Sequence, residues 1–558
     1  MKNSNHFSQS ILGITLEGFQ VFDKPTHIPF GKLTFLFGPN SAGKSSIQDA
    51  FSIFQQVIYG KNTKVEIEKI RPDLERHWRR TKEFGGDYVP KMSIGIQHCF
   101  IPNFEDTSCD FRRYRYEEDY SETASWFSTS QKFESRLIFN KKNLPNKVGL
   151  HYEIDYELYS DEKLLIGRVG SGIHVDLEHP YFIFSTLSDE FYRLSLEYKD
   201  KINIKNGYLY IPTGVLGFHL GGDELDDPRE RLLFPDYRKI FKRERGKKNN
   251  EDITQALKIA LNELGRIVHM IINHVNSHMP QLVERVDASR QIPTCNDLTF
   301  KFERIDGKLV LLEKEGDSER KWGTTTNYIW LAFAFKDDLE EKINHGLHDK
   351  ELSNILDNIN STLSGSLFIE LGYQLGYSYR IILSESNSIA LVEGHPLNPE
   401  EFGFEINIFL KSVVSGNHYF EDVGSGIGYV LPVLCALNSY IVEFATIQQP
   451  ELHLHPALQA EMGDVFIEAS LAGKQILIET HSEHLLLRIL KRIRQTHLQA
   501  AIAPELKINA DDVCVLYFDP SLNGITIVKR LRISRDGEFM DRWPRGFFPE
   551  RELELFDE

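Results

Sequence analysis

Hydrophobic and polar positions near the start of the chain predict two strands and then a helix. Residues 11–22 alternate between apolar and polar side chains, and residues 26–37 end in the apolar run Leu33–Phe37, which is typical of a buried strand. After a glycine-rich loop, residues 46–60 carry apolar side chains at helical spacing. This stretch is therefore predicted to run strand, turn, strand, loop, helix.

Residues 401–500 show a second regular pattern, in which strands alternate with helices. The predicted strands cover residues 405–413, 439–450 and 474–482, and the predicted helices cover 424–437, 458–473 and 483–495. Such alternation predicts an α/β fold with a parallel sheet and crossover helices. Residues 501–558 add two strands, at 514–520 and 525–533, and an aromatic end.

Residues 61–400, between these regions, predict a mixed α+β insertion. Its β-like runs are 91–100, 181–186, 207–212, 297–305 and 377–384. Its clearest helix is 254–286, whose apolar seam is spaced alternately by four and three residues, at Leu257, Leu261, Leu264, Val268, Ile271 and Val275. This helix packs either on its own domain or, as a short helical arm, on a partner subunit.

Composition narrows the class of protein. Of 558 residues, 41% are hydrophobic and 26% are charged, which excludes a mainly disordered chain. The 64 Lys and Arg against 81 Asp and Glu give a net charge of -17, which argues against a histone-like coat for nucleic acid. Five scattered cysteines without a CxxC pair predict a reducing cytoplasm, and we expect no membrane span because no apolar run is long enough.

The strongest chemical signal is residues 38–45, Gly-Pro-Asn-Ser-Ala-Gly-Lys-Ser, which match GxxxxGK[ST] between a predicted strand and a predicted helix. A nucleoside triphosphate needs unobstructed backbone N–H groups, a lysine for its β and γ phosphates, and a hydroxyl on Mg²⁺. We therefore expect ATP to bind here, with Ser45 holding Mg²⁺. The expected ATP-binding residues are Gly38, Asn40, Ser41, Ala42, Gly43, Lys44, Ser45 and Ser46.

Three weaker signals follow in the chain. Residues 422–428, Asp-Val-Gly-Ser-Gly-Ile-Gly, open a predicted helix and so offer an anion site, although alone they are better explained as a glycine-rich turn. One strand then ends in Gln-Gln-Pro-Glu-Leu-His-Leu-His-Pro at residues 448–456, and the next ends in Glu-Thr-His-Ser at 479–482. His481 alone would be a core-edge histidine, but the order of the motifs favours a contact with the γ-phosphate.

This order of motifs resembles the ABC/AAA-type ATPases related to the OLD (overcoming lysogenization defect) family. The chain is most similar to the subgroup with a WPxGFF tail, here Trp543-Pro544-Arg545-Gly546-Phe547-Phe548, and it shares that subgroup's QPELHLHP and THSEHLLLR runs. The resemblance covers residues 10–60 and 404–550. It implies an ABC-type nucleotide-binding core split between residues 1–60 and 401–500, the large insertion at 61–400, and a strand pair with the tail at 501–558.

The resemblance also implies a function and partners. The subgroup includes the PtuA-like ATPases of Septu-type antiphage defence, which work with a separately encoded HNH nuclease. In ABC-type folds, Ser425 and Gly426 of one subunit cap the ATP of another, which implies a homodimer through the nucleotide sites, or a higher oligomer. Only 77 residues follow His481, so a Toprim nuclease domain of the OLD type is not expected here.

Two positions depart from the family pattern. Gln448 stands where an acidic residue holds Mg²⁺, and Gln449 stands where ABC enzymes place the catalytic glutamate, although this subgroup commonly has glutamine there. Amides are weak metal ligands and poor general bases. We expect Gln448 as a weak metal ligand, Glu451, His481 and Gln449 as the catalytic residues, and slow turnover.

Other features leave alternatives open. The basic run Arg238–Lys248 is a solvated loop, or it contacts nucleic acid or an acidic partner, and the nucleic-acid contact would suit a DNA-repair or chromosome-associated ATPase that binds DNA directly. A basic helix face is expected at residues 488–494. His274 and His278 are spaced to share a metal, but no carboxylate stands near them in the sequence. A membrane transporter is disfavoured by the insertion and the tail.

Overall fold

The computed structural model describes most of the regions that carry the motifs. The described residues are 10–59, 64–81, 87–102, 126–142, 152–169, 172–176, 179, 203–205, 208–212, 268, 271–280, 283–290, 292–294, 296, 298–305, 308–311, 373–383, 389–390, 402–412, 416–438, 442–521 and 524–544.

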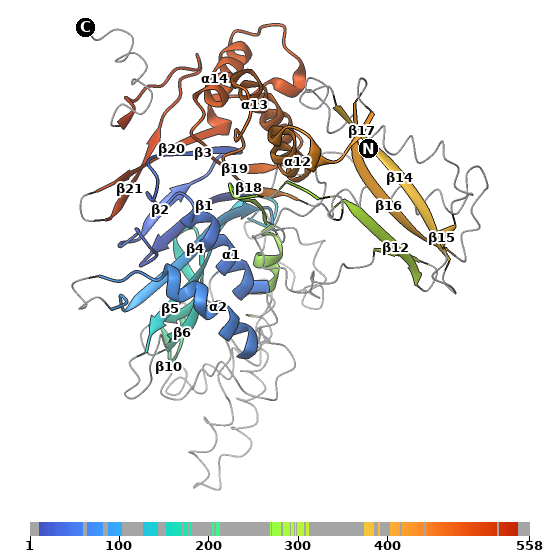
Figure 1. Cartoon of the computed structure of the whole chain (residues 1–558). Helices are drawn as coiled ribbons and strands as arrows, with labels where there is room; N and C mark the ends of the chain where they lie inside the picture. Colours follow the sequence, from blue (N-terminus) through green and yellow to red (C-terminus); the bar gives the residue numbers. More distant parts are fainter. Residues whose placement is uncertain are drawn as a thin grey trace. The chain divides into compact units, whose positions relative to one another are not determined.

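The chain forms two compact units (Figure 1). The first unit takes residues 1–30, 41–281 and 520–528, and the second takes 31–40, 282–519 and 529–558. Residues 31–40 thus belong to the second unit although the chain on both sides of them belongs to the first. The prediction of an α/β fold whose nucleotide-binding core is split in the sequence is confirmed.

The first unit is built on a nine-stranded antiparallel sheet in the order β2-β1-β4-β5-β6-β7-β8-β10-β9. The strands are β1 (Ser10–Glu17), β2 (Thr26–Pro29), β4 (Lys91–Phe100), β5 (Gln131–Lys141), β6 (Tyr152–Ser160), β7 (Lys163–Val169), β8 (Gly172–Asp176), β9 (Asn203–Lys205) and β10 (Tyr208–Pro212). Two helices, α1 (Ser46–Tyr59) and α2 (Lys64–His77), belong to the same unit. Phe30 packs on Phe51 of α1, and Trp78, just after α2, packs on Phe139 of β5, so apolar contacts hold both helices to the sheet.

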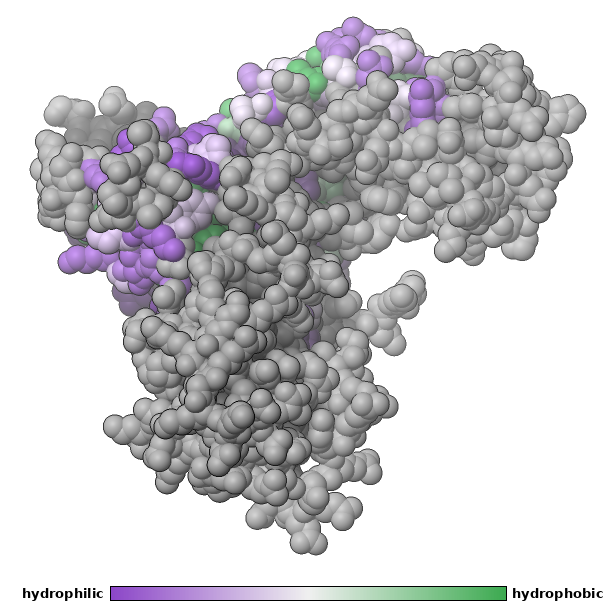
Figure 2. Space-filling model, turned by 90° about the horizontal axis from the view of Figure 1, so that it is seen from below, coloured by the Kyte–Doolittle hydropathy of each residue, from purple (hydrophilic) through white to green (hydrophobic). Residues whose placement is uncertain are grey.

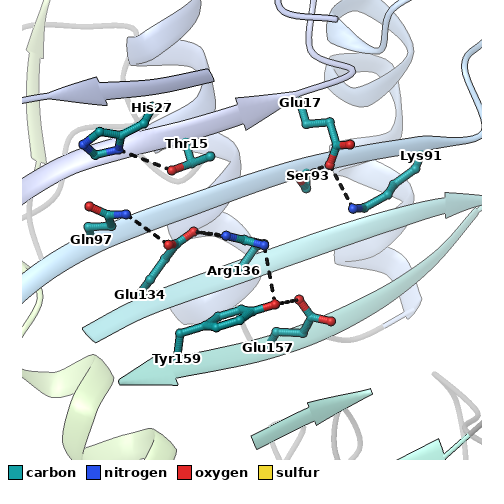
Figure 3. A network of polar contacts seen from close by, with 10 residues as sticks. All are labelled: Thr15, Glu17, His27, Lys91, Ser93, Gln97, Glu134, Arg136, Glu157 and Tyr159. Carbon is teal, nitrogen blue, oxygen red and sulfur yellow. Dashed lines mark hydrogen bonds and ion pairs between the residues drawn. The ribbon is translucent and has the colours of Figure 1, made fainter. Parts of the chain in front are cut away.

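One face of this sheet carries a ladder of polar side chains across β1, β4, β5 and β6 (Figure 3). Arg136 binds Glu134 at 2.7 Å, and its guanidinium carbon lies 4.6 Å from the centre of the Tyr159 ring. The Tyr159 hydroxyl donates to Glu157 at 2.8 Å, and burial raises the pKa of that carboxyl. Each of these charges has an opposite charge or a hydroxyl beside it. We therefore assign the ladder to holding the strands together.

The second unit contains the predicted parallel sheet. Its order is β11-β18-β19-β3-β20-β21, and the pairs from β11 to β20 are all parallel. The strands are β3 (Leu33–Phe37), β11 (Val283–Val286), β18 (Phe444–Gln448), β19 (Gln475–Glu479), β20 (Val513–Pro520) and β21 (Thr526–Leu531), of which residues 520 and 526–528 are assigned to the first unit. The N-terminal strand β3 therefore completes a sheet made mostly by the C-terminal half of the chain.

Three helices cover this sheet. α12 (Ser425–Asn438) packs on β11 and β18, α13 (Pro456–Leu471) packs on β19 and β3, and α14 (Glu483–His497) packs on α13. Asp464 of α13 binds both Arg488 and Arg492 of α14, at 2.7 and 2.6 Å. Two of the arginines on the expected basic face of α14 therefore join this helix to α13 by ion pairs.

A second, antiparallel sheet of this unit has the order β13-β12-β16-β14-β15, with β17 paired to β16. Its strands are β12 (Thr299–Ile305), β13 (Lys308–Leu311), β14 (Tyr373–Leu383), β15 (Ile389–Ala390), β16 (Phe402–Ser412) and β17 (Gly416–His418). The short 3-10 helix η6 (Phe420–Asp422) then leads into α12.

The helix expected over residues 254–286 is too long at its C-terminal end. Residues 271–277 are helical, but the chain then turns and enters strand β11 at Val283. Its described part packs within the first unit, where the Val275 carbonyl contacts His98 of β4 and the Asn276 side chain accepts from Ser135 of β5. The residues before 268 and the strand expected at 181–186 lie outside the described residues.

Figure 2 shows one face of the molecule, on which the described surface is mainly hydrophilic with small apolar spots. Within the described parts of the chain, no helix combines the length and the apolar character that crossing a membrane requires.

Candidate functional site

The predicted motifs of the second unit meet at one edge of its parallel sheet. Glu479 at the end of β19 is in register with Gln448 at the end of β18 on one side and with Leu36 of β3 on the other. Because parallel strands end at the same edge, the loops after Phe37, Gln448 and Glu479 all leave the sheet there. This is the edge at which open α/β sheets bind ligands.

The phosphate-binding loop starts from this edge. Gly38 has a φ of 137°, and a Cβ on it would lie 2.5 Å from the Phe518 carbonyl oxygen, so this position requires glycine. Asn40, the last residue of the 31–40 segment of the second unit, is exposed. Trp543, of the recognised tail, packs edge-on against Phe37 with ring centres 5.3 Å apart, and so supports the strand that leads into the loop.

The remainder of the loop lies in the first unit. Ser41 has a φ of 62° and Gly43 a φ of 92°, so the backbone turns sharply in the left-handed region before α1 begins at Ser46. Lys44 is only 3% exposed, and Ala42 is anchored by a hydrogen bond from the Thr526 hydroxyl to its carbonyl at 2.8 Å. The loop is therefore held in shape by its own unit.

A chain of side chains lies behind the loop in the first unit. Ser46 donates its hydroxyl to the Gln20 side-chain oxygen, and the Gln20 amide nitrogen contacts Nδ1 of His77. The other ring nitrogen of His77 lies 3.7 Å from an oxygen of Asp49 on α1. Gln20 has a φ of 47°, and its N–H donates to the His77 carbonyl at 2.7 Å, so this chain fixes the predicted site residue Ser46.

The turn after β18, residues 449–453, is named the strand-end turn here. Two of its non-glycine residues have positive φ angles, Gln449 at 43° and His453 at 61°. The N–H of Gln449 donates to the Glu479 carbonyl at 2.6 Å, which ties the turn to β19. A left-handed conformation at a non-glycine residue persists only when its surroundings enforce it, and such residues concentrate at functional sites.

Glu451 and His481, two of the predicted catalytic residues, are brought together by the sheet. Oxygen Oε1 of Glu451 accepts a hydrogen bond from the backbone N–H of His481 at 2.8 Å. Oxygen Oε2 is buried and has no hydrogen-bond donor among the described residues. A buried carboxylate oxygen without a donor suits a water or a cation. This oxygen therefore fits contact with a water molecule or a cation such as Mg²⁺. The side chain of His481 itself is exposed.

Gln448, the predicted metal ligand, also has a structural contact. Its side-chain oxygen accepts a hydrogen bond from the N–H of Ala288 at 3.1 Å, in the turn after β11. Its neighbour in the sheet, Glu479, is a carboxylate only 8% exposed. We did not predict Glu479 as a site residue, although its place at a strand end just before His481 was a signal for it.

The glycine–serine motif, residues 422–428, forms the start of α12 as predicted. Ser425 is the first helical residue. Gly426 lies against the strand-end turn, because a Cβ on it would come within 2.8 Å of the His453 carbonyl oxygen. Tyr429 of α12 stacks on the His453 ring with centres 4.9 Å apart. The motif and the strand-end turn are therefore in direct contact within the second unit.

Two other features left open by the sequence are the histidine pair and the basic run. His274 and His278 lie together with ring centres 4.6 Å apart, but His278 is stacked on Phe100, and burial lowers the pKa of His274 to about 4. In the part of the chain that the structure describes, no three His, Cys, Asp or Glu side chains gather to hold a metal ion. The basic run Arg238–Lys248 lies outside the described residues.

Comparison with known families agrees with this geometry. The chain matches the family described as AAA ATPase domain over residues 10–486, and it therefore belongs to this family of ATPases. The match runs through the insertion at 61–400, where we recognised no motif.

Three SMC head domains are among the solved structures to which the chain is similar, and no curated protein matches it. One is the Smc head bound to the C-winged helix domain of ScpA, at 13% identity and a TM-score of 0.37, covering 94% of this chain and 98% of that one. A second, from Pyrococcus furiosus, is bound to the C-terminal domain of ScpA, at 13% identity and a TM-score of 0.34, covering 94% and 96%. The third, from Thermotoga maritima, has 9% identity and a TM-score of 0.32, covering 94% and 99%. At TM-scores below 0.5, these alignments carry no argument about the function of this chain.

Proposed function

We propose that this protein is a slowly hydrolysing ATPase that binds Mg·ATP on the loop joining β3 to α1. The observation that carries the proposal is the register of three parallel strands, which brings the start of the phosphate-binding loop at residues 38–40, the Gln-Gln-Pro-Glu motif and the Glu-Thr-His-Ser motif to one edge. Membership of the ATPase family supports the same activity.

The proposed binding roles follow the loop. The backbone N–H groups of Gly38 and of residues 40–46, Gly43 among them, surround the phosphates, and Lys44 neutralises the β and γ oxygens. The hydroxyl of Ser45 would hold Mg²⁺, and the side-chain oxygen of Gln448 would serve as a weak ligand. The remaining loop residues, Asn40, Ser41, Ala42 and Ser46, shape the turn.

The proposed hydrolytic roles belong to the strand-end turn and its neighbour. Mg²⁺ supplies charge stabilisation for phosphoryl transfer, while the protein must orient the attacking water. Glu451 accepts a proton or orients the water through Oε2, Gln449 holds the water by hydrogen bonds, and His481 contacts the γ-phosphate. Since no carboxylate stands at position 448 or 449, turnover is slow.

The glycine–serine motif is proposed to act between two copies of the chain. Ser425 and Gly426 at the N-terminus of α12 cap the γ-phosphate bound by another subunit, so ATP holds a head-to-tail homodimer, or a higher oligomer, together. Hydrolysis releases the cap, which makes the assembly a nucleotide-controlled switch.

The proposed biological role rests on the shared WPxGFF tail and the family motifs. We propose that the chain is the regulatory subunit of a cytoplasmic antiphage defence complex and restrains a separately encoded HNH nuclease while ATP is bound. The run Arg238–Lys248 is a candidate contact for nucleic acid in that complex. Co-purification from the native operon tests this role, because recovery of the ATPase without a nuclease would contradict it.

Nucleotide binding and turnover test the enzymatic part. Wild-type protein is expected to bind ATP and to release phosphate slowly, whereas Lys44→Ala loses binding because the β and γ oxygens lose their cation. Equilibrium dialysis with labelled ATP and single-turnover phosphate release measure the two steps separately. Equal binding by both proteins would refute the proposed site.

A further inference from the structure

The turn that follows β11, residues 287–290, is named the bridging turn here, and it contains an unusual arginine. Arg290 is 6% exposed, and its guanidinium donates to four backbone carbonyls. Nε donates to Tyr429 at 2.7 Å, and Nη1 donates to Asp287 at 3.1 Å and to Gln448 at 2.9 Å. Nη2 donates to Gln449 at 3.1 Å. Four of its five N–H groups are thus used on main-chain oxygens.

Three of these four carbonyls belong to two functional elements, and the fourth, that of Asp287, lies in the bridging turn itself. Tyr429 lies in α12, which begins with the glycine–serine motif, whereas Gln448 and Gln449 form the end of β18 and the start of the strand-end turn. The bridging turn contacts β18 a second time, because Ala288 donates its N–H to the Gln448 side chain. Just beyond it, Ile292 packs so closely on α12 that a Cβ on Gly428 would lie 2.6 Å from it.

The strand-end turn needs such support. Gln449 and His453 are both left-handed, which costs free energy for residues with a Cβ and persists only if neighbouring groups enforce it. Arg290 bonds the carbonyl of Gln449 itself, and Tyr429, whose carbonyl it also bonds, stacks on His453. One side chain therefore acts on both strained residues, on one directly and on the other through Tyr429.

We propose that Arg290 is a positioning residue that couples the glycine–serine motif to the hydrolytic turn of the same chain. This inference rests on the proposed function. When the partner's ATP binds Ser425 and Gly426, it fixes the position of α12. The hydrogen bonds of Arg290 then transmit that position to Gln449 and Glu451 in the strand-end turn. Each site is thereby competent to hydrolyse only while α12 is held by the neighbouring nucleotide.

Arginine suits this task and lysine does not. Its planar guanidinium presents five N–H groups in a fixed fork, so it can reach carbonyls on α12 and on β18 together. An ammonium group has three donors on one atom and cannot span the same set. Arg290→Lys keeps the charge and most of the stem but breaks the bridge, and Arg290→Met removes the donors while filling a similar volume.

The test compares these variants with Arg492→Lys, a matched control in the same unit whose parent arginine binds Asp464 on α13. Each protein is measured for ATP affinity, for kcat and KM of hydrolysis, and for hydrogen exchange of a peptide covering residues 444–456. A misplacement of about 1 Å near the reacting groups can cost about 10²-fold in rate. We expect kcat to fall about 10- to 100-fold in both Arg290 variants, with ATP affinity unchanged, because the phosphate-binding loop is not altered. Exchange in residues 449–453 rises in both variants and not in the control.

Gly428→Ala gives an independent perturbation, since its methyl group must displace Ile292 and with it the chain that follows the bridging turn. Gly428→Ala is expected to lower kcat while ATP-dependent assembly is retained. If the Arg290 variants do not fold, this variant tests the coupling between α12 and the strand-end turn. Wild-type kcat in the folded variants, with unchanged exchange, would refute the coupling alone. A wild-type protein with no turnover above Lys44→Ala would instead refute the proposed function.

Discussion

Replacement of Glu451 by glutamine removes one charge from the hydrolytic turn and almost nothing else. The side chain keeps its shape, and its remaining oxygen can still accept from the His481 N–H, now 2.8 Å from Oε1. The change replaces a charge-assisted hydrogen bond with a neutral one, which costs about 1 kcal/mol of folding stability. Oxygen Oε2, which is buried and receives no hydrogen bond from any described residue, becomes an amide nitrogen that neither accepts a proton nor binds a cation.

The expected effect on catalysis is much larger than the effect on folding. Loss of a general base typically removes about 10²- to 10⁴-fold in rate, which corresponds to about 3–5 kcal/mol of barrier. We therefore expect Glu451→Gln to bind ATP like the wild type and to melt within a few degrees of it, while single-turnover phosphate release falls at least about 100-fold.

Glu468→Gln is the matched control for this measurement. Glu468 lies on α13 in the same unit, and burial raises the pKa of its carboxyl, so neutralising it should cost little stability and no activity. Single-turnover release of labelled phosphate with excess enzyme separates the chemical step from product release. A Glu451→Gln protein that hydrolyses ATP within about twofold of the wild type would refute the assigned role.

Three further changes have defined outcomes. Gln448→Glu is expected to raise turnover and to lower the Mg²⁺ concentration needed for half the maximal rate, because it restores an acidic ligand. Glu479→Gln, beside it in the sheet, is expected to raise that concentration. Metal titrations of the ATPase rate test both variants. Burial lowers the pKa of His98 to about 4, so its unfolded form binds a proton that the folded form does not between about pH 6.5 and 4. The contribution of neutral His98 to the free energy of unfolding is therefore fully present above pH 6.5 and is lost as the pH falls to 4, by up to about 3 kcal/mol. Thermal melts of His98→Gln should show a smaller loss of stability over this pH range. An unchanged pH slope in that variant would contradict the assignment.

Much of the second unit follows from local sequence patterns. Residues 444–448 and 475–479 are apolar runs between helices of the right length, and a parallel sheet is the arrangement that buries them on both faces. The phosphate-binding loop was recognisable because its chemistry depends on residues that are adjacent in the sequence. The pairing of β3 with β19 and β20 fits the same logic, since β3 is an entirely buried strand.

Other elements depend on contacts that a local pattern does not contain. Helix α2 was not predicted, because it contains Pro72 and is mostly charged. Among its described side chains, those of residues 71–77, Leu74 and His77 are buried. The expected helix over 254–286 wrongly included the residues of β11, because β11 is defined by its pairing with the distant strand β18 and not by a local pattern. Arg290 was missed since its partners, in α12 and after β18, are about 140 and 160 residues away in the chain.

Mass in solution is the sharpest test of the proposal that ATP joins two copies of this chain through the glycine–serine motif. Light scattering is run with and without Mg²⁺ and a slowly hydrolysed ATP analogue on the wild type, Lys44→Ala and Ser425→Arg. The analogue is expected to double the mass of the wild type. No change is expected for Lys44→Ala, which cannot bind the nucleotide, or for Ser425→Arg, which binds it but cannot cap a partner's. A wild-type mass that ignores the analogue, or a Ser425→Arg protein that assembles as the wild type does, would contradict the proposal.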